Sequence, residues 1–136
     1  MLLRLPLART QTLSLEHHLA LETIASGHGN VDLLVGLLKA LYTAWNLRAE
    51  APAGEGIRPF QRAEAGLVRC IARAERGEAR TMFDADKTAI EEVLVLHDRQ
   101  LATAPAHRFL TAFDNLNRFA VEGLKSPIPP LFTPPP

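Results

Sequence analysis

Six arginines recur at regular spacing between residues 58 and 80 and form the strongest polar pattern in the sequence. They are separated by 4, 7, 4, 3 and 4 residues, so on an α-helix their side chains would share one face about 60° wide. The glutamates of this stretch fall elsewhere on the helix, which leaves few of these arginines with an acidic neighbour at i±4. A row of unpaired guanidinium groups could bind phosphates or an acidic protein surface. We call the set the arginine row: Arg58, Arg62, Arg69, Arg73, Arg76 and Arg80.

The arginine row has three interpretations. It could be an outer face that is only solvated, or that pairs with acids of the following helix such as Asp84, Glu91 and Glu92. It could bind an acidic protein partner. It could also bind nucleic acid, but Asn and Gln, which read bases, are nearly missing from this face. If the row binds a partner, reversing the charge of Arg69 and Arg73 should weaken the complex without lowering the melting temperature.

Histidine and cysteine side chains could also carry chemistry, but their spacing predicts no site. His17 and His18 are adjacent, so on a helix they diverge by about 100° and cannot easily bind one ion. His97-Asp98 is similar to the dipeptide of the HD phosphohydrolases, but the further histidines and aspartates of such a site are missing. Cys70 falls at the margin of an apolar face, which favours a buried thiol. We therefore expect no metal, no cofactor, no catalytic residue and no enzymatic activity.

A single all-α domain is expected to position these residues. Alternating strand patterns are nearly absent, and apolar residues recur at helical spacing in five segments. Ser14 is expected to cap the first helix, which runs to about residue 26 with Leu15, Leu19 and Ile24 facing inward and Leu21 beside them. The other helices are expected at about residues 31–50, 60–80, 84–101 and 105–121.

The later helices each present one apolar face. The expected inward residues are Phe60, Ala63, Leu67, Ile71 and Ala74, then Ile90, Val93, Leu94, His97 and Leu101, then Phe109, Phe113, Leu116 and Ala120. We divide the chain into an extended arm (1–12), a compact five-helix bundle (13–124) and a proline-rich tail (125–136). The apolar residues of the arm and tail pack either on this domain or on a partner.

The stretch ASGHGN, residues 25–30, is expected to join the first two helices. Gly27 suits the left-handed position after a helix end, and Asn30 suits the N-cap of the next helix. A phosphate-binding loop would typically follow a strand, and Asp32 would repel an anion. The leucine-rich helix that follows has no face suited to reading DNA.

The helix predicted for residues 31–50 is apolar well beyond one face. It could be the central helix of the bundle, or it could be shared with a second copy in a two-fold interface. In the second case the protein is a homo-oligomer, most simply a dimer. The residues expected at that interface are Leu34, Leu38, Leu41, Tyr42 and Trp45.

Composition excludes several classes of protein. Fifteen basic residues balance fifteen acidic ones, which argues against a dedicated nucleic-acid coat. Cys70 is the only cysteine, so there is no intrachain disulfide and no cysteine-built zinc site. The most apolar window, 31–47, contains Asp32 and Lys39, whereas a spanning helix needs about 20 nearly uncharged residues. We expect a cytoplasmic protein with no membrane partner.

The runs HLALETIASGHGNVDLLVGLLKALYTAW and LHDRQLATAPAHRFLTAFDNLNRF resemble short helical proteins of proteobacteria and phage-like elements. Some of those proteins are labelled Fis-type transcriptional regulators. The resemblance covers most of residues 13–120, rests on spacing rather than on a catalytic motif, and implies a mobile-element context.

Together these patterns predict a small non-enzymatic protein that acts by protein–protein interaction, as a regulator or inhibitor of a host protein. The alternative is a nucleic-acid-binding transcriptional regulator that uses the arginine row.

Overall fold

The computed structural model describes residues 5–48, 55–78, 82–121 and 126–128. These ranges contain five α-helices and a short 3-10 turn, which confirms the predicted all-α bundle. The helices are α1 (Leu7–Ala25), α2 (Val31–Leu47), α3 (Arg58–Glu75), α4 (Asp84–Thr103) and α5 (Ala106–Val121), and the turn η1 (Glu55–Ile57) precedes α3.

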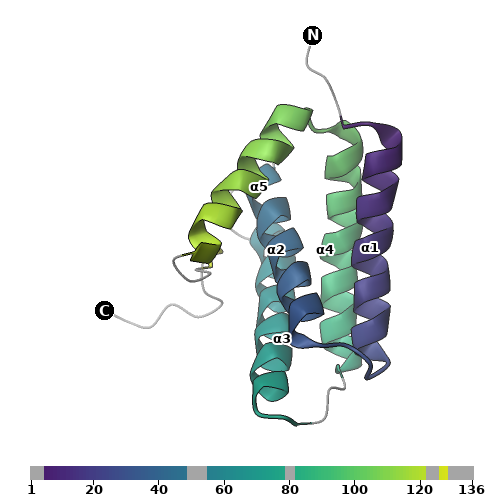
Figure 1. Ribbon diagram of the computed structural model, residues 1–136, viewed down its shortest axis with the longest axis vertical. Coiled ribbons are helices and arrows are strands. Elements are labelled where there is room, and N and C mark those ends of the chain that lie inside the picture. The colour runs from purple at the N-terminus through teal and green to yellow at the C-terminus, as the bar shows by residue number, and fades with distance from the viewer. Residues whose placement is uncertain (1–4, 49–54, 79–81, 122–125, 129–136) are drawn as a thin grey trace.

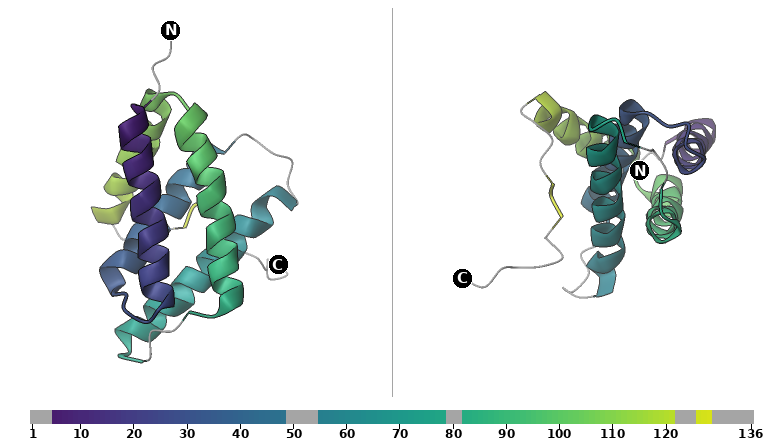
Figure 2. Two further views of the ribbon diagram at one scale, coloured as in Figure 1. Left: turned by 90° about the vertical axis from the view of Figure 1, so that its right-hand side faces the viewer. Right: turned by 90° about the horizontal axis from the view of Figure 1, so that it is seen from below.

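The helices form two packed layers. α1 and α4 lie side by side and cross the layer of α2 and α3 at an angle (Figure 2). α5 crosses α2 obliquely near one end of the bundle (Figure 1). As a result, α2 contacts each of the other four helices.

This central position accounts for the apolar character of α2. All five residues expected at a two-fold interface, Leu34, Leu38, Leu41, Tyr42 and Trp45, are buried within the single chain. The ring of Trp45, for example, packs edge-on against Phe60 of α3, with centroids 5.3 Å apart. The assignment of these five residues to self-association is therefore corrected, because other helices of the same chain already cover them.

The core face of α4 is as predicted, since Ile90, Val93, Leu94, His97 and Leu101 are all buried. Within the described ranges, no helix combines the length and the apolar character that crossing a bilayer requires.

The first helix begins earlier and faces differently from the prediction. α1 starts at Leu7, so residues 7–12 are helical and do not belong to an extended arm. Pro6 precedes this start, and Thr10 Oγ1 donates to its carbonyl at 3.0 Å. Leu21 and Ile24 are buried, whereas Leu15 and Leu19 are 59% and 55% exposed. A second helical stripe, which includes His17 and Leu21, faces inward because α1 packs against α4 as well as α2.

The connection between α1 and α2 follows the predicted pattern. Gly27 has a φ of 87°, and the amide of His28 donates to the carbonyl of Thr23 at 3.0 Å, which closes the end of α1. Asn30 caps α2, because its Oδ1 accepts from the amide of Leu33 at 2.9 Å. Gly29 lies so close to α1 that an added Cβ would stand 2.5 Å from Cγ1 of Ile24.

The other chain segments also depart from the predicted boundaries. α3 ends at Glu75 rather than near residue 80, and Gly77 takes the left-handed conformation with a φ of 70°. In the tail, Ile128 is buried in the main core cluster. Ser126 holds this turn, since its hydroxyl accepts from the amide of Ile128 at 3.1 Å. This part of the tail therefore packs on its own fold.

Candidate functional site

Three members of the arginine row have partners within the molecule. Arg69 forms an ion pair with Asp86 of α4. The guanidinium of Arg73 lies 4.9 Å from the ring centre of Phe83. Arg76 donates to both carboxylate oxygens of Glu78, at 2.9 and 3.3 Å. The row is therefore in large part bound to the chain itself.

The rest of the row divides between exposed and undescribed residues. Arg58 and Arg62 are exposed and make no side-chain hydrogen bond, ion pair or ring contact with another described residue. Arg80 lies outside the described residues. Among the described members of the row, the free part is thus one pair of arginines in the first turns of α3.

Asp86 changes what is expected of Arg69. Its side chain is only 8% exposed, against 55% for Arg69, and its Oδ2 has no hydrogen-bond partner in the described chain. Among the described residues, the acid of α4 that pairs with the row is therefore Asp86, rather than the exposed Asp84, Glu91 or Glu92. Because Arg69 neutralises a buried carboxylate, charge reversal there should lower the melting temperature, which corrects the earlier expectation.

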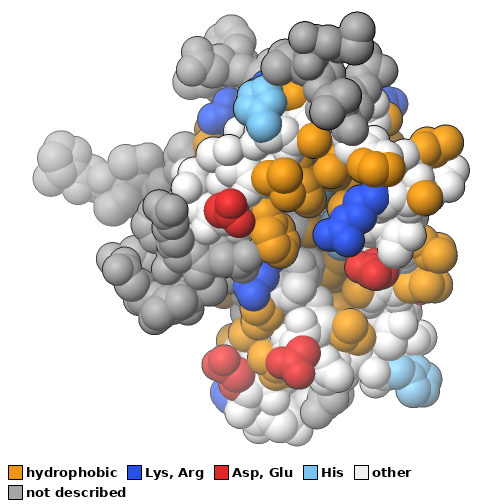
Figure 3. All heavy atoms as spheres, turned by 45° about the horizontal axis from the view of Figure 1, so that its top comes forward, with side chains coloured by type: hydrophobic (Ala, Val, Ile, Leu, Met, Phe, Trp, Pro, Cys, Tyr) orange, Lys and Arg blue, Asp and Glu red, His pale blue; other side chains and the backbone are white. Residues whose placement is uncertain are grey.

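An apolar groove of about 670 Å³ lies between α1, α2 and α5. Figure 3 shows hydrophobic side chains around this hollow and charged side chains at its edge. The groove falls within the range of roughly 300–1,000 Å³ that is usual for ligand-binding clefts. Leu110 and Phe113 of α5 form one wall and are 52% and 42% exposed. Phe113 was expected in the core and instead lines this groove.

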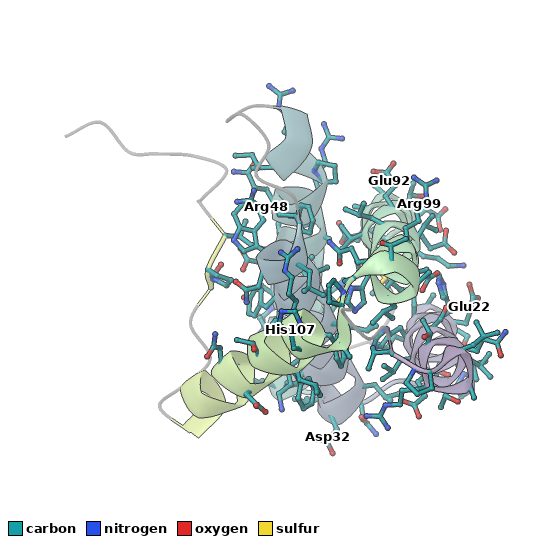
Figure 4. All side chains as sticks on the ribbon, turned by 90° about the horizontal axis from the view of Figure 1, so that it is seen from above. Glu22, Asp32, Arg48, Glu92, Arg99 and His107 are labelled. Carbon is teal, nitrogen blue, oxygen red and sulfur yellow. The ribbon has the colours of Figure 1, made fainter. Side chains whose placement is uncertain are left out.

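Helical periodicity places the lining residues of α1 and α2. On α1 the lining residues Arg9, Leu13, Glu16, His17 and Ala20 recur every three or four positions, so they share one face. On α2 the residues that line the floor recur in the same way: Asp32, Leu33, Gly36, Leu37, Lys39, Ala40 and Thr43. Seen from above, α1 and α5 stand on either side of α2, and Asp32 points outward from the bundle (Figure 4).

The charged side chains of the groove are unpaired. Within the described residues, none of them makes an ion pair or a side-chain hydrogen bond, in contrast to Arg69 and Arg76 of the arginine row. They can therefore meet charges on a ligand without first breaking contacts in the protein. The set consists of Arg9, Glu16, Asp32, Lys39 and Asp114.

Two neutral histidines, His17 and His97, line the groove. The rings of His17 and His97 lie 5.6 Å apart, centre to centre. His97 Nδ1 is 2.8 Å from Oε1 of Gln100, whose amide nitrogen donates to the carbonyl of Ala44 at 2.9 Å. Burial lowers the pKa of His17 to about 4, with a further contribution from His97. Burial also lowers the pKa of His97. Both rings are therefore neutral at pH 7.

His18 and Asp98, the residues that follow His17 and His97 in the sequence, are also in contact. His18 Nε2 is 2.9 Å from Oδ2 of Asp98, so the dipeptides 17–18 and 97–98 face each other across α1 and α4. Spacing along the chain does not predict that the two dipeptides meet, because their proximity depends on how α1 and α4 pack. The described residues contain no group of three or more side chains placed to hold a metal ion.

Two other groups that could carry chemistry are buried. Cys70 is buried, and its sulfur accepts from Arg73 at 3.4 Å. His17 lines the groove, and its Nδ1 atom is buried and has no hydrogen-bond partner in the described chain. Gly36 was the available sequence signal for the groove. A glycine inside a helix costs about 1 kcal/mol relative to alanine, so a glycine at this position signals a possible role other than helix stability.

Neither a protein-family model, nor a curated protein, nor a solved structure matches the chain.

Proposed function

We propose that this protein acts without catalysis, by protein–protein interaction, and that the groove between α1, α2 and α5 receives a segment of the partner. The observation that carries the proposal is the pair of exposed apolar side chains, Leu110 and Phe113, on the wall of an open groove. Large apolar side chains that meet a partner in a desolvated pocket supply much of the binding energy of protein interfaces.

We assign the partner-binding role to the groove, whereas the sequence suggested the arginine row for that role. Arg69 already neutralises Asp86, and Arg76 is held by Glu78, so these cations are less available to an acidic partner. The charged residues of the groove have no such partners in the described chain. The further proposal of a regulator or inhibitor of a host protein in a mobile-element setting rests on the resemblance of the sequence, and the proposed cytoplasmic location rests on its composition.

Nucleic-acid binding is the second candidate, and Arg58 and Arg62 favour it. They are exposed, lie four residues apart and have no side-chain partner among the described residues. A gel-shift series in increasing salt tests this function, because phosphate contacts weaken steeply as salt rises. Absence of a shift at low salt would eliminate it.

Photo-crosslinking in the cells that produce the protein tests the groove. A benzophenone amino acid at Leu110 should give a discrete protein adduct. The matched control is Val68, which is 49% exposed on α3 and does not line the groove. The proposal predicts an adduct from position 110 that position 68 does not give. Equal labelling from both positions, or none from position 110, would contradict it.

A further inference from the structure

We infer that the occupant of the groove is an amphipathic α-helix of a partner protein, about three turns long, with acidic residues at one end and basic residues at the other. The inference rests on the proposed function, since it specifies what the groove receives.

The length and floor of the groove fit a helix. Its α1 wall extends from Arg9 to Ala20 and its α2 floor from Asp32 to Thr43. Each stretch rises about 16 Å at 1.5 Å per residue, which is three helical turns. Helix-in-groove recognition places apolar residues at i, i+3, i+4 and i+7 into such a surface.

Gly36 indicates how closely the occupant approaches. It lies in the middle of α2, is exposed, and lines the groove. An added Cβ there would meet nothing within 4 Å, so the packing of this chain does not require a glycine. With Ala40 one turn later it forms a floor of small side chains, over which the backbone of a second helix can pass closely.

The charges of the groove give the occupant a polarity. Figure 1 shows that α1 and α2 run antiparallel, so the N-terminal part of α1, which contains Arg9, lies toward the C-terminal end of α2, and Asp32 begins the opposite end. Glu16 and Lys39 are the middle residues of α1 and α2, so the two ends of the groove are marked by Arg9 and by Asp32. Asp114 adds a third acid on the α5 wall. A complementary helix places acids near Arg9 and bases near Asp32.

Four synthetic peptides of 14 residues test this polarity. They share one Leu/Ala face at i, i+3, i+4, i+7 and i+11, and their first and last turns carry Glu-Glu or Lys-Lys in all four combinations. Fluorescence anisotropy against the full chain measures each affinity. The two mixed-sign peptides should bind about fivefold more tightly than the two like-sign peptides, the gain expected of exposed ion pairs.

Protein variants locate the binding and its charge dependence. Gly36→Leu should abolish binding of all four peptides, and Gly36→Ala should retain most of it. The double variant Arg9→Glu/Lys39→Glu makes the groove acidic throughout, so the peptide with Lys at both ends should become the tightest. If this variant does not fold, Arg9→Gln/Lys39→Gln serves instead and should remove the preference for mixed-sign peptides.

The outcomes separate the two proposals. Equal affinity of all four peptides, with loss of binding in Gly36→Leu, would overturn the charge polarity and leave the groove as a helix-binding site. Absence of binding by every peptide, or binding that Gly36→Leu does not change, would overturn the helical occupant, and the crosslink from Leu110 then decides separately whether the groove receives a partner at all.

Discussion

Mild acid should destabilise this protein through His17. The pKa of His17 is lowered from 6.5 to about 4 in the folded chain, mainly by burial and then by the neighbouring His97. The unfolded chain binds the proton more readily, so stability is lost as the pH falls from about 6.5 toward 4. Between pH 7 and pH 5 the loss from this group is at most about 2 kcal/mol. The pKa of His97 is lowered by burial too, which acts in the same direction.

Urea unfolding of the wild type and of His17→Gln at both pH values measures the contribution. The variant removes the titrating ring, so its stability should fall by about 2 kcal/mol less than that of the wild type between pH 7 and pH 5. His28→Gln is the matched control, since His28 is exposed on the connection between α1 and α2. An equal fall in the wild type and His17→Gln would refute the assignment of the acid sensitivity to this ring.

Three substitutions test the packing, with Arg62→Ala as the control for the first. Arg69→Ala should lower the free energy of unfolding by about 1–2 kcal/mol because it leaves buried Asp86 unpaired. Arg62→Ala should change the free energy of unfolding by less than about 0.5 kcal/mol. Urea titrations compare the two variants. Gly29→Ala should destabilise by about 1–3 kcal/mol, because its methyl would collide with α1; an unchanged melting temperature would show that the connection can shift. Gly36→Ala should stabilise by about 0.5–1 kcal/mol, since its methyl meets nothing within 4 Å; a lower melting temperature in calorimetry would contradict this.

Local signals in the sequence were enough to predict the connection between α1 and α2. Gly27 takes the left-handed position and Asn30 caps α2, because both roles depend on a few neighbouring residues. The core face of α4 was equally predictable, since a single apolar stripe left one way to orient the helix.

Features that depend on packing between helices were not predictable. α1 carries two competing apolar stripes, and the choice between Leu15 and Leu21 as the buried residue depends on where α4 lies. The pairing of Arg69 with Asp86 and of His17 with His97 has the same origin. The groove required the placement of α5 over α2, which left Phe113 exposed at its wall instead of in the core.

The central claim is that the groove receives a segment of another protein, and crosslinking from Leu110 in two backgrounds tests it most directly. Gly36→Ala adds only a methyl to the floor of the groove, whereas Gly36→Leu fills it. We predict that the adduct from position 110 persists in Gly36→Ala and disappears in Gly36→Leu, with both variants folded by circular dichroism. The same adduct at undiminished yield in Gly36→Leu would contradict the claim.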